Sequence, residues 1–360
     1  MTASMPKVPS QVHQIRPLDD IRWRDFVVSH PLSSVFHTTA WLESLRRTFQ
    51  YEPIAFTTSA PGSKLDNAIV FCRVDSWITG RRLVSLPFSD HCDPLVDDGS
   101  DGDIILSSLQ RELAENRLRY AEIRATRAMN TFRDRSDSIL TYCTHRIDLR
   151  SDVDTLFRRC HKNSTQRKIR RAEREGLIYK EGRTDALLDQ FYRLLLLTRR
   201  RHNAPPLPRR WFQNLVDCFG SALQIRMALK DNRPIAAILT LQHKDTLMFK
   251  YGCSDAGLHR LGGMQFLFWN TILEAKSTGL RTFDLGRSEW GHKGLITFKD
   301  HTGATHSELP YFRLTATRRS LPNVRPAGAS WRGRLPKTLL PFVSDSAFCS
   351  AGEFLCRHFA

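Results

Sequence analysis

The 360-residue sequence has no apolar run long enough to span a membrane, and its eight cysteines include no Cys-x-x-Cys pair. A membrane-spanning helix needs about 20 apolar residues, and zinc sites and disulfide frameworks need cysteines at characteristic spacings. Residues 1–11 lack the apolar core of a secretory signal. No pair of the thirteen histidines has the spacing of metal ligands. These absences predict a reduced, cytoplasmic protein without a metal site.

Common catalytic signatures are also missing. The sequence contains no G-x-x-x-x-G-K-[ST] loop, no H-E-x-x-H and no G-x-S-x-G; the run 286–290 lacks the final glycine of the last motif. These absences disfavour phosphoryl transfer, zinc-dependent hydrolysis and α/β-hydrolase chemistry. With 41% hydrophobic and 25% charged residues, the composition is that of a globular protein and not of a disordered one.

Acidic residues are scarce in three segments, and these segments account for the whole net charge of +17. Residues 158–174 carry eight basic side chains and one acid, residues 199–210 carry five arginines, and residues 313–337 carry seven basic side chains. The rest of the chain is close to neutral. Concentrated positive charge of this kind favours an anionic partner.

The clearest pattern that is present is an internal repeat. Residues 53–125 contain three β-like runs, a helix-periodic stretch over 104–116 and a fourth run at 120–124. Residues 223–286 repeat this order, with a helix over 264–277 that Gly279 ends. The order βββαβ is that of the core of the N-acetyltransferase (GNAT) superfold. The repeat therefore predicts an α+β chain with two tandem GNAT-like domains and mixed, mainly antiparallel sheets.

The predicted domains are residues 1–150, residues 151–315 with the catalytic motif, and a basic tail over 316–360. Asp152 is expected to cap a helix, and a second helix ending at Gly176 has Ile169 and Ala172 as its only apolar residues. A short helix between residues 345 and 359 is expected to pack back on a domain. The alternative is that it lies on a membrane surface.

Several residues of the second repeat follow strand ends, where loops converge and ligands gather. Arg260 precedes Gly262 and Gly263 at the start of a helix, and a helix N-terminus favours an anion. The spacing of these three residues departs from the Arg/Gln-x-x-Gly-x-Gly/Ala loop of GNAT enzymes that use acyl-CoA. The cluster consists of Tyr251-Gly252, Asp284-Leu285-Gly286, Phe298-Lys299 and the loop 258–263.

Taken in order with residues 35–41 and 201–203, this cluster resembles the Fem family of aminoacyltransferases and its BioF-like acetyltransferase relatives. The similarity covers about residues 30–315. Fem enzymes take amino acids from aminoacyl-tRNA and attach them to a peptidoglycan precursor, and relatives act in exopolysaccharide or cell-envelope pathways. The resemblance implies an N-acyltransferase or aminoacyltransferase. The chain lacks the long helical-arm insertion of some Fem members, so the use of tRNA stays open.

The resemblance assigns catalysis to Phe298 and Lys299 and acceptor binding to Arg201, Tyr251 and, more loosely, Arg46. A fixed cation at Lys299 would stabilise the negative charge that develops on the donor carbonyl during attack by an amine. Asp90 is the candidate proton acceptor, with His91 or the substrate itself as alternatives. Asp284 and Gly286 are expected to bind substrate, and Arg260, Gly262 and Gly263 to bind the donor.

We expect no tightly bound cofactor, and either acyl-CoA or aminoacyl-tRNA as co-substrate. The expected acceptor is an anionic small molecule or a lipid-linked sugar of the cell envelope, with the protein at the inner face of the membrane or free in the cytoplasm. The alternative function is a non-enzymatic one: RNA binding through residues 165–175, or peripheral membrane attachment within a polysaccharide assembly complex. The sequence does not indicate an oligomeric state.

Overall fold

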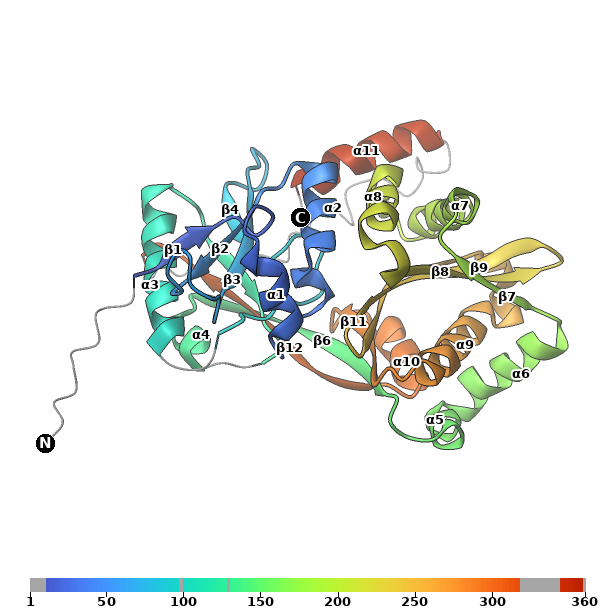
Figure 1. Cartoon of the computed structure of the whole chain (residues 1–360). Coiled ribbons are helices and arrows are strands. Elements are labelled where there is room, and N and C mark those ends of the chain that lie inside the picture. The colour runs from blue at the N-terminus through green and yellow to red at the C-terminus, as the bar shows by residue number, and fades with distance from the viewer. Residues whose placement is uncertain (1–10, 97–99, 128–129, 318–343, 359–360) are drawn as a thin grey trace, which may run out of the picture. The chain divides into compact units, whose positions relative to one another are not determined.

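The computed structural model describes residues 11–96, 100–127, 130–317 and 344–358 (Figure 1). These residues form two compact units. The N-terminal unit runs to Leu140 and resumes at Pro310, and the C-terminal unit runs from Thr141 to Leu309 and includes residues 344–358. Strands β6 (Ser138–Asp148) and β12 (Thr305–Leu314) each contribute residues to both units.

The sheet of the N-terminal unit has the order β1-β2-β3-β4-β5-β12. The pair β4–β5 is parallel, and the others are antiparallel. Helices α3 and α4 contribute to the buried cluster that includes Phe71, Leu109 and Phe312. The elements are β1 (His13–Ile15), α1 (Arg22–Ser29), α2 (Thr39–Phe49), β2 (Pro53–Thr57), β3 (Ile69–Val74), β4 (Arg82–Val84), α3 (Ser100–Glu115), β5 (Ala121–Arg124) and α4 (Asn130–Arg135).

The sheet of the C-terminal unit has the matching order β7-β8-β9-β10-β11-β6. Here β10–β11 is the parallel pair, and the remaining pairs are antiparallel. The elements are α5 (Val153–Arg159), a π-helical turn (Lys162–Gln166), α6 (Arg167–Arg174), β7 (Ile178–Gly182), α7 (Asp185–Arg201), α8 (Arg209–Phe219), β8 (Leu223–Lys230), β9 (Arg233–His243), β10 (Thr246–Ser254), a 3-10 turn (Ala256–Leu261), α9 (Gly263–Ser277), β11 (Thr282–Ser288), α10 (Lys293–His301) and α11 (Asp345–His358).

The predicted duplication is confirmed. The β2-β3-β4-α3-β5 order of one unit repeats as β8-β9-β10-α9-β11 in the other, with the same pattern of parallel and antiparallel pairing. The last strand of each sheet follows the other repeat in the chain, because β12 pairs with β5 and β6 pairs with β11. The third strand of the first repeat, β4, is short and ends at Val84, since Leu86 and Phe88 adopt positive φ.

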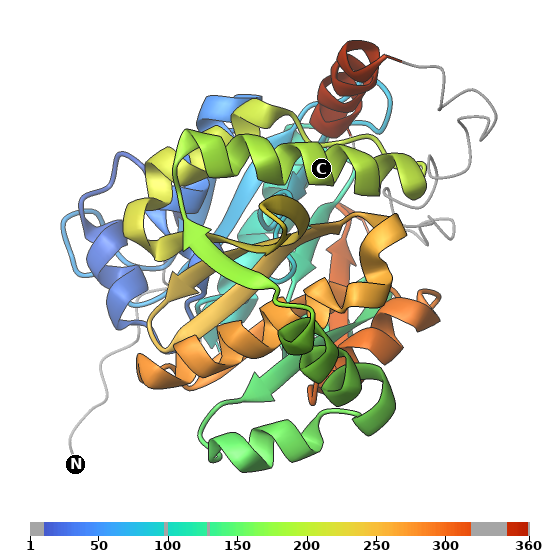
Figure 2. The same cartoon turned by 90° about the vertical axis from the view of Figure 1, so that its right-hand side faces the viewer.

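Helices cover both faces of the C-terminal sheet. Helices α7 and α8 lie on one face, and α9 lies on the other with α6 packed against it (Figure 1). Figure 2 shows these layers from the side, with α9 in orange and α7 in yellow-green. Because the sheet is covered on both faces, the middle strands are buried along nearly their whole length, as in the run Ile235–Leu241 of β9.

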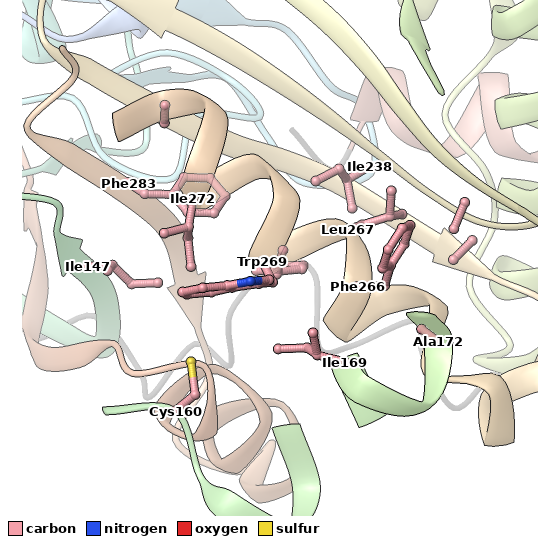
Figure 3. Close-up of a cluster of buried hydrophobic side chains, with 14 of the residues drawn as sticks. Ile147, Cys160, Ile169, Ala172, Ile238, Phe266, Leu267, Trp269, Ile272 and Phe283 are labelled. Carbon is pink, nitrogen blue, oxygen red and sulfur yellow. The ribbon is translucent and has the colours of Figure 1, made fainter. Parts of the chain in front are cut away.

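The largely polar helix α6 is attached through the two apolar residues that its sequence offers. Ile169 is 1% exposed and Ala172 is fully buried. Both belong to a cluster contributed by α6, α9, β6 and β11, in which Trp269 is drawn among Ile147, Cys160 and Ile169 (Figure 3). The remaining surface of α6 is therefore free to present basic side chains. Asp152 caps the preceding helix as expected, accepting from the Thr155 amide at 2.7 Å.

Helix α11 packs on α7 and α8. Asp345 pairs with Arg200 at 2.6 Å, Glu353 pairs with Arg210 at 2.7 Å, and Phe348 is 2% exposed. The basic stretch that precedes this helix lies outside the described residues. None of the helices in the described part of the chain combines the length and apolar character needed to cross a membrane.

Candidate active site

The parallel strands β10 and β11 separate soon after they begin. They pair from Thr246–Thr282 to Met248–Asp284, after which β10 continues beside β9 and β11 continues beside β6. A bulge between Phe249 and Tyr251 accompanies this separation. A cavity of about 340 Å³ opens beside the end of β10. Its lining comes from β10, the loop into α9, and α6, α7, β9 and α10, and includes Lys168, Thr198, Arg201, Gly252, Ser254, His259, Gly263, Phe298 and Lys299.

Lys299 is held in one position at this cavity. It lies on α10 and is 2% exposed. Its ammonium donates to the carbonyl of Gly286 at 3.0 Å and to the carbonyl of Arg287 at 3.1 Å. Phe298, beside it, packs edge-on against Phe268 of α9, with ring centroids 5.4 Å apart. A buried cation fixed by backbone groups needs little reorganisation to act on a developing negative charge.

Asp284 and Gly286 position Lys299 and do not line the cavity. Gly286 has φ +70°, a conformation that a residue with a side chain rarely adopts. Its amide donates to Asp284 Oδ1 at 2.8 Å, and the other carboxylate oxygen of Asp284 accepts from Arg146 at 3.0 Å. Asp284 therefore holds the turn that presents the Gly286 carbonyl to Lys299.

The glycine pair at the start of α9 allows α6 to approach closely. Gly262 has φ +78°, and a Cβ atom built on it would lie 2.5 Å from the carbonyl oxygen of Lys168. A Cβ on Gly263 would lie 3.1 Å from Ile235. Gly263 lines the cavity, so the first turn of α9 faces it. Gly262 therefore cannot take a side chain unless the backbone of α6 shifts, whereas at Gly263 only the side chain of Ile235 would have to yield.

Replacing Gly262 by Ala should destabilise the protein by about 2–4 kcal/mol, because the left-handed conformation costs about 1–2 kcal/mol and the new methyl group also displaces the backbone of α6. Gly279→Ala is the matched control, since Gly279 has φ +79° with nothing within 4 Å of the added atom. Urea unfolding of both variants measures the difference. Equal losses of stability in the two variants would show that α6 can shift to make room for the added methyl group.

Polar side chains form part of the cavity lining. Arg201, the last residue of α7, donates to the carbonyl of Ser254 at 3.3 Å and contacts His259 Nε2 at 3.4 Å. His259 also lies 2.8 Å from Ser254 Oγ. Burial, followed by the charges of Arg201 and Lys168, lowers the pKa of His259. The lowered pKa favours the neutral form of His259 at pH 7.

A second hollow, the basic groove, lies beside the cavity. Its volume is about 530 Å³, and Lys168 lines both. Arg260 belongs to this groove and not to the cavity. The other basic side chains come from the polar face of α6, which does not pack into the hydrophobic cluster. The lining consists of Arg167, Lys168, Arg171, Arg174, Glu175 and Arg260.

Three predicted residues are not part of the lining of this cavity. Tyr251 is 8% exposed, and its hydroxyl accepts from Trp211 Nε1 at 2.9 Å beneath α8. Arg46 forms an ion pair with Glu43 at 2.6 Å on α2, and Asp90 accepts from the Tyr311 hydroxyl at 2.6 Å through its backbone carbonyl. Arg46 and Asp90 belong to the N-terminal unit. Their assigned roles therefore remain predictions from the resemblance.

Sequence reasoning missed Lys168, Thr198, Ser254 and His259 as parts of the cavity. In the sequence Lys168 is one of several basic residues of a charged helix, and Thr198 stands between an apolar run and three arginines. His259 falls within the loop 258–263 that the sequence singled out for its glycines. Its position in that loop was the only indication in the sequence, because the contacts of His259 with Ser254 and Arg201 depend on the fold.

The fold and this cavity define the class of protein. Residues 159–294 match the acetyltransferase (GNAT) domain family. This stretch holds most of the cavity, including α9 and its glycine loop. The protein therefore carries a GNAT acetyltransferase domain and is an N-acyltransferase by class. No curated protein matches the sequence.

Solved structures with the same fold extend over both units. The crystal structure of FemX has a TM-score of 0.64 at 14% identity, covering 84% of this chain and 97% of that one. The C-terminal domain of a candidate lysylphosphatidylglycerol synthetase from Agrobacterium fabrum has a TM-score of 0.53 at 14% identity, covering 82% and 91%. A tandem GNAT protein from the clavulanic acid pathway has a TM-score of 0.53 at 10% identity, covering 85% and 99%. At these identities the likeness concerns the fold, and it confirms the predicted Fem-like tandem GNAT architecture.

Proposed function

We propose that the C-terminal unit transfers an acyl or aminoacyl group from an activated ester or thioester donor to an amine of a cell-envelope precursor. The observation that carries the proposal is the Lys299 ammonium, buried at the cavity and fixed by the carbonyls of Gly286 and Arg287. An activated donor needs no covalent enzyme intermediate. The protein has only to align donor and amine and to stabilise the charge that forms between them.

The reaction is a nucleophilic acyl substitution. The amine nitrogen forms a bond to the donor carbonyl carbon, and negative charge collects on the carbonyl oxygen beside Lys299. The C–O or C–S bond to the leaving group then breaks, and the leaving group takes up a proton. His259 accepts the proton that the amine loses, because it lines the cavity and its lowered pKa favours the neutral form at pH 7. In this proposal the proton acceptor is His259 and not Asp90.

The donor carries phosphate groups that lie in the basic groove. Its five basic side chains face a single acid, and Lys168 connects it to the cavity. Both acyl-CoA and aminoacyl-tRNA present phosphates at a distance from the acyl group, so both fit this arrangement. Guanidinium groups bind phosphate oxygens in pairs.

Arg201 is placed to bind an anionic acceptor. Its guanidinium lies in the cavity wall beside His259, so a carboxylate or phosphate held there would bring a nearby amine close to the proton acceptor. The name of the Agrobacterium structure links this fold to an aminoacylated phospholipid. A lipid-linked or otherwise anionic envelope precursor is therefore the acceptor class that we propose.

The direct test offers both donors to the full-length protein. The protein is incubated with acetyl-CoA or with charged tRNA, each with a panel of amine-bearing envelope precursors, and amide products are detected by mass spectrometry. Product from one donor identifies the donor class. Tight, salt-sensitive RNA binding without an amide product from either donor would favour the non-enzymatic alternative.

Reversing two charges of the basic groove should weaken donor binding. We expect Arg171→Glu/Arg174→Glu to lower the affinity for CoA or tRNA on the order of tenfold or more and to reduce its salt dependence, because fewer counterions are released. Fluorescence anisotropy at two salt concentrations measures both effects.

The matched control for this variant is Arg150→Glu/Arg281→Glu. Both arginines are highly exposed, at 74% and 71%, and lie outside the groove, so the net charge changes equally. An equal loss of affinity in the two double variants would mean that total charge, and not the groove, attracts the donor.

A further inference from the structure

Three potential metal ligands from three separate elements meet in the C-terminal unit. His145 lies on β6, Asp300 on α10 and His306 on β12, and their ligand atoms all lie within 4.8 Å of one another. Asp300 Oδ1 is 2.9 Å from His306 Nδ1 and 3.4 Å from His145 Nε2. None of these residues is needed for the proposed acyl transfer.

The burial of His145 also points to a ligand at this cluster. Its side chain is fully buried, and neither ring nitrogen has a hydrogen-bond partner among the described residues. A buried polar group without a partner costs roughly 1–3 kcal/mol, so such groups usually serve a purpose.

The spacing fits a transition-metal ion. Zinc binds imidazole nitrogen and carboxylate oxygen at about 2.0–2.2 Å in a tetrahedral arrangement, which places neighbouring ligand atoms roughly 3.3 Å apart. The separations of Asp300 Oδ1 from His306 Nδ1 and from His145 Nε2 already lie within about half an ångström of this value. Calcium and magnesium prefer sites built from oxygen alone. Two histidines and one carboxylate leave at least one position open for water.

We propose that His145, Asp300 and His306 form a binding site for a divalent first-row transition-metal ion of the zinc type. The ion would join β6, α10 and β12. Asp300 follows Lys299 on α10. The ion would therefore hold the helix that carries the proposed catalytic lysine against β6 and β12. The Asp300 carboxylate offsets the repulsion between the ion and the Lys299 ammonium.

Cobalt and zinc titration of the full-length protein tests the site after treatment with a chelator. We expect one Zn²⁺ per chain by calorimetry, visible Co²⁺ absorption typical of four-coordinate nitrogen and oxygen ligation, and a higher unfolding temperature with Zn²⁺. His306→Ala should lower the Zn²⁺ affinity at least about 100-fold, since even loss of an outer-shell partner costs 10–100-fold. His306 is exposed, so this variant should fold.

A second ligand variant and a control variant complete the test. Asp300→Asn retains the shape of the side chain and should also weaken binding. His292→Ala removes another exposed histidine, paired with Glu289 at 3.9 Å outside the cluster, and should leave binding unchanged. Lack of stoichiometric binding in the parent protein, or equal affinities in His306→Ala and His292→Ala, would overturn the proposal. These readouts do not use acyl transfer, so their failure is distinct from a failure of the proposed function.

Discussion

Replacing Lys299 by Met should lower the rate of acyl transfer on the order of 10²–10³-fold while changing donor affinity little. The ammonium acts on charge that exists in the transition state and not in the bound donor, so its loss affects kcat more than KM. The effect should be large because Lys299 is 2% exposed and fixed by two carbonyls. Steady-state kinetics with the donor identified by product analysis measures it.

A structural role for Lys299 predicts a different result. Its removal leaves the Gly286 and Arg287 carbonyls with one donor fewer, which costs about 1–3 kcal/mol of stability. Activity should therefore be compared well below the unfolding temperature, with circular dichroism as the check on the fold. Lys293→Met is the matched control, because Lys293 is an exposed residue at the start of the same helix. Retention of the full rate in Lys299→Met would refute the mechanism.

The second large effect concerns the stability of the N-terminal unit. Glu122 on β5 is 5% exposed and lies between two buried arginines. Its carboxylate accepts from Arg313 at 2.6 and 2.9 Å and from Arg124 at 3.0 and 3.1 Å. Glu122→Gln keeps the shape but removes the carboxylate charge that both buried guanidinium groups share. We expect a loss of about 3–5 kcal/mol in the free energy of unfolding, as for other broken buried ion pairs.

Glu112→Gln provides the comparison. Glu112 pairs with Arg73 at 2.8 Å, but the two side chains are 17% and 32% exposed, so the same substitution should cost less than about 1 kcal/mol. Urea unfolding at pH 7 measures both. Similar small losses in the two variants would show that the Arg124–Glu122–Arg313 network contributes little.

The same network predicts part of the acid sensitivity. Burial alone would raise the pKa of Glu122, but the charges and hydrogen bonds of Arg124 and Arg313 lower it to about 2 from an ordinary value of 4.5. A lowered pKa stabilises the fold above pH 4.5, and this contribution disappears as the pH falls toward 2. In Glu122→Gln the unfolding free energy should depend less on pH within that interval.

Periodicity and turn residues predicted the repeated elements well. The strands Pro53–Thr57 and Leu223–Lys230 begin at the first residue of the two predicted repeats, and α9 begins within one residue of the expected position. Such elements are specified locally, because alternating or helical burial must match the sequence pattern. Strands β6, β7 and β12 were not predicted, since their pattern is weaker and their pairing partners lie far away in the chain.

For the site, sequence motifs identified the positions whose role depends on the local backbone. Gly262 and Gly286 both adopt positive φ, and Phe298-Lys299 lies on one short helix at the cavity. Tyr251 shows the limit of this reasoning. A tyrosine near a strand end can point to either face, and the bulge after Phe249 and the indole of Trp211 direct this one beneath α8.

By itself, the sequence determined the class of fold, its duplication, the glycine turns and the concentration of basic charge on α6. Each of these is a pattern formed by residues that lie close together in the chain. Only the tertiary structure decided which side chains meet, because His259, Arg201 and Lys168 come from separate elements, as do His145, Asp300 and His306. Spacing along the chain carries no information about such groups, since packing of the strands and helices sets the distances between them.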